Sequence, residues 1–126
     1  MIDRALLKQT IKEIASIEGI QMDPNHLALD VLALSEVFKE NESQFKNVIN
    51  SLKTAIYDVI NNDRIGEDLK FNLEGWKSYH FSSPYPKFQG EEDMRMVYQP
   101  ISHILILAFG HRYITSDFYQ RFQTRI

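Results

Sequence analysis

Residues 94–112 read MRMVYQPISHILILAFGHR, and the hydrophobic pattern changes within this stretch. Over residues 94–99 one face would carry Met94, Met96 and Tyr98 and the other Arg95, Val97 and Gln99, as expected for a β-strand whose two faces differ. Residues 104–109 are almost wholly apolar, which indicates a strand that is central in a sheet and buried on both faces. Residues 99–103 supply the turn between the two. The stretch therefore predicts two consecutive strands in the centre of a sheet.

The first half of the chain has a helical period instead. Asp23-Pro24 is a helix-start signal, because the carboxylate can accept from a free amide and proline suits the first helical position. Apolar side chains then recur at helical spacing over 27–38 and over 45–60, separated by a polar break at 41–43. Because the break is short, we expect an antiparallel helical hairpin over residues 24–62.

Shorter elements are expected around the hairpin. They are an extra N-terminal helix over residues 1–16 that stops at Gly19, a short strand over 20–22, a strand over 76–82, and a closing helix capped by Thr115-Ser116-Asp117 that runs through Arg125. The prediction is one α+β domain over residues 1–126. N-terminal helices pack on a twisted antiparallel sheet of three to four strands, and residues 66–126 carry the sheet and the site.

The amino-acid composition limits which kinds of catalysis and metal binding the chain can carry out. The chain has 126 residues, 44% of them apolar, which suits one domain, and it has no cysteine. Disulfides, zinc ribbons, iron–sulfur clusters and thiol catalysis are therefore excluded. No phosphate-binding loop, dinucleotide loop, zincin helix or esterase elbow is present. No pair of His or carboxylate residues has metal-ligand spacing on one element, so we expect no metal and no small-molecule cofactor.

Charge and hydropathy bear on location and partners. No apolar run is long enough to cross a bilayer, and the first ten residues carry three charges, so we expect a cytoplasmic protein without a membrane partner. The net charge is -3, which opposes non-specific binding to nucleic acid. Residues 1–63 hold six basic and ten acidic side chains, whereas residues 64–126 hold eight and seven. We therefore expect a polyanion to bind residues 64–126 rather than residues 1–63.

Polar and titratable side chains gather near the predicted strand ends. Arg95 interrupts an otherwise uncharged strand, so it must reach either solvent or an anion. His111 and Arg112 directly follow the buried strand, where side chains are held firmly yet reach solvent. Each residue also has an ordinary structural explanation, such as a solvated cation or a packed histidine.

A series of short motifs lies within residues 66–113. They are Glu67-Asp68-Leu69-Lys70-x-Asn72-Leu73-x-Gly75-Trp76, Ser78-Tyr79, Asp93-x-Arg95-x-Val97-Tyr98, Ile104-Leu105 and Gly110-His111-Arg112. These motifs resemble those of the RelE/ParE superfamily of toxins from bacterial type II toxin–antitoxin modules. The order of short strand, helical hairpin and three antiparallel strands also matches that superfamily.

The resemblance implies a ribosome-dependent endoribonuclease that cuts messenger RNA by attack of a 2′-hydroxyl on the adjacent phosphate. A partner antitoxin would inhibit the enzyme by binding to it. Arg95 and Arg112 occupy the family's two arginine positions and would stabilise charge on the phosphate. Glu67 aligns with the acidic general base of the YoeB-like branch. His111 resembles a catalytic or substrate-orienting position, and Tyr119 lies one place beyond a tyrosine that the family uses.

The substrate-binding positions depart from the family pattern. His80 and Ser82 stand where the family has two lysines, and Lys87 is reached only through an apparent insertion over residues 83–90. We expect four residues to bind substrate: Lys70, Lys77, His80 and Lys87.

Two other functions remain open from the sequence. One is a non-catalytic toxin of the ParE branch, which would bind DNA gyrase through protein contacts. The other is an inactive interaction module with the same fold, which the acidic net charge would suit. Retention of Glu67 together with Gly110-His111-Arg112 favours the nuclease.

Overall fold

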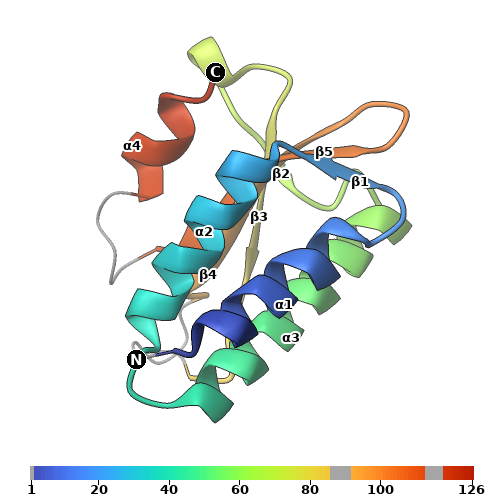
Figure 1. Ribbon diagram of the computed structural model, residues 1–126. Helices are drawn as coiled ribbons and strands as arrows, with labels where there is room; N and C mark the ends of the chain where they lie inside the picture. The colour runs from blue at the N-terminus through green and yellow to red at the C-terminus, as the bar shows by residue number, and fades with distance from the viewer. Residues whose placement is uncertain (1, 86–91, 113–117) are drawn as a thin grey trace.

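The computed structural model describes residues 2–85, 92–112 and 118–126, which form helices on both sides of a sheet (Figure 1). The helices are α1 (Arg4–Ala15), α2 (Pro24–Val37), α3 (Glu42–Asn61) and α4 (Phe118–Gln123). The strands are β1 (Ile20–Met22), β2 (Glu67–Asp68), β3 (Lys77–Phe81), β4 (Met94–Pro100) and β5 (Ile104–His111). The predicted α+β class is confirmed, with its N-terminal helices and short C-terminal helix.

The sheet differs from the expected one in size and direction. Its five strands lie in the order β1-β5-β4-β3-β2, and β1 runs parallel to β5 while the other pairs are antiparallel. The two-residue β2 is too short to carry a periodic signal. The parallel pair arises because the α2–α3 hairpin and three strands separate β1 from β5 in the chain, long enough for a crossover connection.

Local signals place the helix ends. The Asp23 side chain accepts from the backbone N–H groups of Asn25 and His26, and Pro24 occupies the first turn of α2. Asn41 caps α3 by accepting from the Gln44 N–H. The polar break at 41–43 therefore ends one helix and starts the next, and α2 and α3 run in opposite directions (Figure 1).

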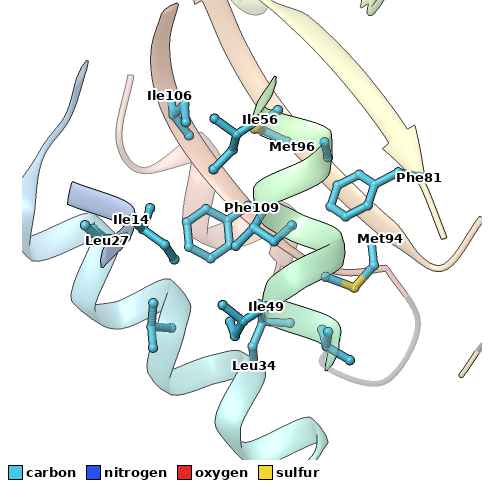
Figure 2. Close-up of a cluster of buried hydrophobic side chains, with 14 of the residues drawn as sticks. Ile14, Leu27, Leu34, Ile49, Ile56, Phe81, Met94, Met96, Ile106 and Phe109 are labelled. Carbon is cyan, nitrogen blue, oxygen red and sulfur yellow. The ribbon is translucent and has the colours of Figure 1, made fainter. Parts of the chain in front are cut away.

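The main core lies between the sheet and helices α1, α2 and α3 (Figure 2). The apolar stripes of α2 and α3 supply residues such as Leu34 and Ile56, both fully buried. From the sheet, Met94, Met96 and Phe109 face these helices and are also fully buried. The predicted helical stripes therefore become the faces that cover the sheet.

A second, smaller core lies on the opposite face, beneath α4. The register shifts between Val97 and Tyr98 of β4, and Leu107 is the extra residue of β5. As a result Leu107 and Ala108 both pack on the α4 side, and Phe109 turns back toward the main core. Strand β5 is buried on both faces, as predicted, and the bulge reverses the alternation of the residues beyond it.

Asp30 of α2 completes the edge of β5 where β1 ends. Strand β1 pairs with β5 only as far as Ile106. Beyond that point the Asp30 carboxylate accepts from the Phe109 N–H at 3.0 Å, and Arg125 donates to the Leu107 carbonyl oxygen at 3.0 Å. The two side chains therefore satisfy backbone groups that a longer strand would otherwise pair.

The same carboxylate anchors the C-terminal helix. Asp30 is fully buried and accepts from Arg121 at 3.1 Å and from Arg125 at 2.8 and 2.9 Å. Helix α4 is therefore tied through its arginines to the edge of β5. This attachment holds Tyr119, at the start of α4, over the sheet.

Candidate functional site

Several predicted site residues share the face of the sheet opposite the main core. In the strand register Glu67 pairs with Ser78, His80 with Arg95, and Arg95 with Gly110. Directly paired residues on neighbouring strands project from the same face, with Cβ atoms about 5 Å apart. The register therefore brings Glu67, His80 and Arg95 onto one surface, with Ser78 between Glu67 and His80.

Arg95 lies against Tyr119 at one end of this surface. Its Nη1 donates to the Tyr119 hydroxyl, and its guanidinium carbon lies 5.1 Å from the centre of the Tyr119 ring. Helix α4 approaches closely here, because a Cβ at Gly110 would lie 2.9 Å from Phe118. The glycine thus lets α4 bring a phenol hydroxyl to a half-buried arginine.

His80 lies between cationic and anionic neighbours. Burial lowers the pKa of His80, and the positive charges of Arg95 and Arg112 lower it further, against smaller opposite effects of Glu67 and Glu92. The His80 imidazole is therefore neutral at neutral pH, when it can accept a proton. Such a group beside two arginines is suited to general-base chemistry at a phosphate.

Arg112 is held next to this group by residues 92–93. Its backbone N–H donates to the Asp93 carbonyl oxygen at 2.8 Å, and its Nη1 donates to the Glu92 carbonyl oxygen at 3.2 Å. Its charge acts on His80. The two predicted arginines therefore both lie within electrostatic reach of one imidazole.

A small pocket opens beside His80. It measures about 170 Å³ and is lined by Ile65, Glu67, Ser78, Tyr79, His80 and Glu92. Ser78 and Glu92 are not among the site residues predicted from the sequence. Ser78 could have been found from the two-residue spacing to His80, which places both on one face of a strand.

The structure does not bring His111 to this surface. His111 is 1% exposed, and its ring centre lies 6.1 Å from that of Phe38 in α2, on the main-core side. Its Nε2 lies 3.5 Å from the Asp93 carboxylate. The extra residue Leu107 explains the placement, because the bulge reverses which face the last residues of β5 present.

The predicted lysines are also spread out. Lys77 forms an ion pair with Asp68 at 2.6 Å, and the strand alternation turns it away from the Ser78–His80 face. Lys70 is exposed and precedes a 3-10 turn over Phe71–Leu73. Lys87 lies outside the described residues, as does the predicted helix cap at 115–117.

Asp93 has a buried environment that makes it a pH-dependent contributor to stability. Its fully buried carboxylate accepts from the Ser83 N–H at 2.7 Å and the Ser83 hydroxyl at 2.6 Å. Burial alone raises the pKa of Asp93, but the hydrogen bonds from His111 and Ser83 outweigh it and bring the pKa below the ordinary value. The ionised form is therefore favoured in the folded state.

We expect Asp93→Asn to lower the free energy of unfolding at neutral pH by about 1.5–3 kcal/mol, since hydrogen bonds to a charged group are lost. The folded pKa is depressed, so this contribution is complete above the unfolded value of about 3.9 and disappears as the pH falls through the folded pKa. Urea titrations between neutral pH and about pH 3 should show the two proteins converging in acid. A constant difference at every pH would contradict this assignment.

Comparison with protein-family models and with curated proteins identifies no relative. The sequence matches no protein-family model, and no curated protein is detectably similar to it. Within residues 2–85, 92–112 and 118–126, no three His, Asp or Glu side chains are grouped so as to hold a metal ion. None of the helices described here is both long and apolar enough to cross a bilayer.

Proposed function

We propose that this chain is a toxin of the RelE/ParE superfamily that cleaves messenger RNA on the ribosome. The observation that carries the proposal is the position of Arg95, which is the cross-strand neighbour of His80 and donates to Tyr119, while the charge of Arg112 also acts on His80. Two guanidinium groups, a neutral imidazole and a phenol are the groups that phosphodiester cleavage by an internal nucleophile needs.

In the proposed reaction a ribose 2′-oxygen attacks the adjacent phosphorus and the bond from phosphorus to the 5′-oxygen breaks. The products are a 2′,3′-cyclic phosphate and a 5′-hydroxyl. Arg95 and Arg112 bind the non-bridging oxygens, whose negative charge grows in the transition state. Tyr119, whose hydroxyl touches Arg95, donates a proton to the departing 5′-oxygen.

We assign the general base to His80 rather than Glu67. The 2′-oxygen adjoins the phosphate, so its base must lie beside the arginine that binds that phosphate. His80 is the direct cross-strand neighbour of Arg95. Glu67 is paired with Ser78, one strand and one same-face position further away. The acidic residue at the family's base position therefore neighbours Ser78 rather than Arg95. We accordingly assign the 2′-hydroxyl proton to the His80 imidazole.

The proposal implies particular partners and a location. A ribosome-dependent nuclease acts in the cytoplasm, on messenger RNA held in the decoding site, and needs an antitoxin to protect its host. The site residues lie in residues 64–126, whose eight basic and seven acidic side chains give a charge of +1. Residues 1–63, with six basic and ten acidic side chains, have a charge of -4. The reaction as written uses only side chains of this chain and no cofactor.

Primer extension on a defined message tests the function. Purified protein is added to translating ribosomes and, separately, to the same message without ribosomes. The proposal predicts cuts at a fixed position within codons, and only in the ribosome sample. Absence of cuts from a protein that still arrests bacterial growth would instead favour the gyrase-binding alternative.

A further inference from the structure

Ser78 is a buried hydroxyl that no described residue satisfies. The residue is 3% exposed, and its Oγ has no hydrogen-bond partner within the described part of the chain. Buried polar groups in folded proteins nearly always have a partner. Ser78 lines the 170 Å³ pocket next to the proposed cleavage centre. Ser78 therefore brings an unsatisfied hydroxyl to the lining of this pocket.

The other polar groups of the pocket define the chemistry of this ligand. Glu67 is the direct cross-strand neighbour of Ser78, and Glu92 lies at the same pocket. Two carboxylates repel phosphate, so the pocket is not a phosphate site. They accept hydrogen bonds from N–H groups. The volume is below the roughly 300–1,000 Å³ of drug-sized sites, which suits one ring system.

We propose that this pocket binds a guanine base of the RNA, next to the phosphate that is cut. The Ser78 hydroxyl donates to guanine O6, and the Glu67 carboxylate accepts from N1–H and the 2-amino group. This order of one donor followed by two acceptors matches the edge of guanine alone. Adenine and cytosine begin with an amino donor, and uracil offers a single N–H.

The inference rests on the proposed function, because it takes RNA as the substrate, and it gives Glu67 a task other than proton transfer. Ile65, an exposed apolar side chain at the pocket, can cover one face of the base. Arg95 then binds the 3′-phosphate of the guanine nucleotide in the pocket. Glu67 and Ser78 become specificity-determining residues.

Binding of guanosine 3′-monophosphate, measured by calorimetry or amide chemical shifts, tests the pocket. Inosine 3′-monophosphate lacks only the 2-amino group and should bind about tenfold more weakly, the loss expected for one charge-assisted hydrogen bond. Adenosine 3′-monophosphate should bind no better than inosine 3′-monophosphate. Glu67→Gln should abolish the preference for guanosine over inosine, because the amide offers only one acceptor. Glu18→Gln, an exposed change near β1 at the other edge of the sheet, should preserve it.

Ser78→Ala separates a binding role from a structural one. It should weaken guanosine monophosphate binding several-fold and leave the melting temperature unchanged or higher, because the Ser78 hydroxyl forms no hydrogen bond to the described residues that the change would remove. Equal affinity for the three nucleotides, or a preference that survives Glu67→Gln, would overturn the pocket assignment. Such a result with intact cleavage on ribosomes leaves the nuclease proposal standing. Guanine-selective binding without cleavage would support the pocket and reject the nuclease.

Discussion

Arg95→Ala is expected to lower the rate of message cleavage on ribosomes by about 10²–10³-fold, the usual effect of removing one group that stabilises developing charge. Arg95 is the direct cross-strand neighbour of His80, the proposed base, and donates a hydrogen bond to Tyr119, the proposed acid. Initial rates of cleavage, read by primer extension, measure the effect. Arg4→Ala, an exposed change on α1, should leave the rate unchanged.

A folding defect must be separated from a catalytic one, because Arg95 is half-buried. Arg95→Lys retains charge and length but loses the planar fork that binds two phosphate oxygens. We expect it to unfold at nearly the wild-type temperature and still cleave at least tenfold more slowly. A folded Arg95→Ala protein that cleaves within about threefold of wild type would remove Arg95 from the mechanism.

Asp30→Ala is expected to lower the free energy of unfolding by about 3–5 kcal/mol, because it leaves two largely buried arginine side chains without their carboxylate. The same change deprives the Phe109 N–H of its acceptor. Helix α4 should loosen as a consequence, since Arg121 and Arg125 attach it to Asp30. Denaturant titration measures the first effect, and amide exchange in residues 118–123 measures the second.

The matched control for this prediction is Glu36→Ala, an exposed acidic position on the same helix. Its effect should stay within about 0.5 kcal/mol. If the two variants lose similar stability, the buried network does not anchor α4. The anchor links fold to function, because α4 carries Tyr119 to Arg95.

Much of the fold could be predicted from strong local patterns. The stripe containing Leu34, the Asp23-Pro24 start and the apolar run of β5 each correspond to the element observed. The two-residue β2 and the parallel pairing of β1 could not be predicted, because both depend on partners far away in the sequence. Long-range pairing leaves little trace in a short window of sequence.

The candidate site was only partly predictable for a similar reason. Arg95 interrupts an uncharged strand, and its position on the sheet face follows from simple alternation. His111 follows the same strand pattern until the extra residue Leu107 turns it toward the main core. Ser78 is chemically unremarkable in sequence. Its proposed importance depends on burial without a hydrogen-bond partner in residues 2–85, 92–112 and 118–126, which only the folded structure reveals.

The central claim is that a ribose 2′-hydroxyl, activated on this sheet face, attacks the neighbouring phosphate. A message carrying a single 2′-deoxynucleotide at the mapped cut position, presented on the ribosome, tests this directly. The account predicts that wild-type protein leaves this message intact, while the all-ribose message yields a 2′,3′-cyclic phosphate and a 5′-hydroxyl. Cleavage of the deoxy-substituted message at the same position and rate would contradict the account.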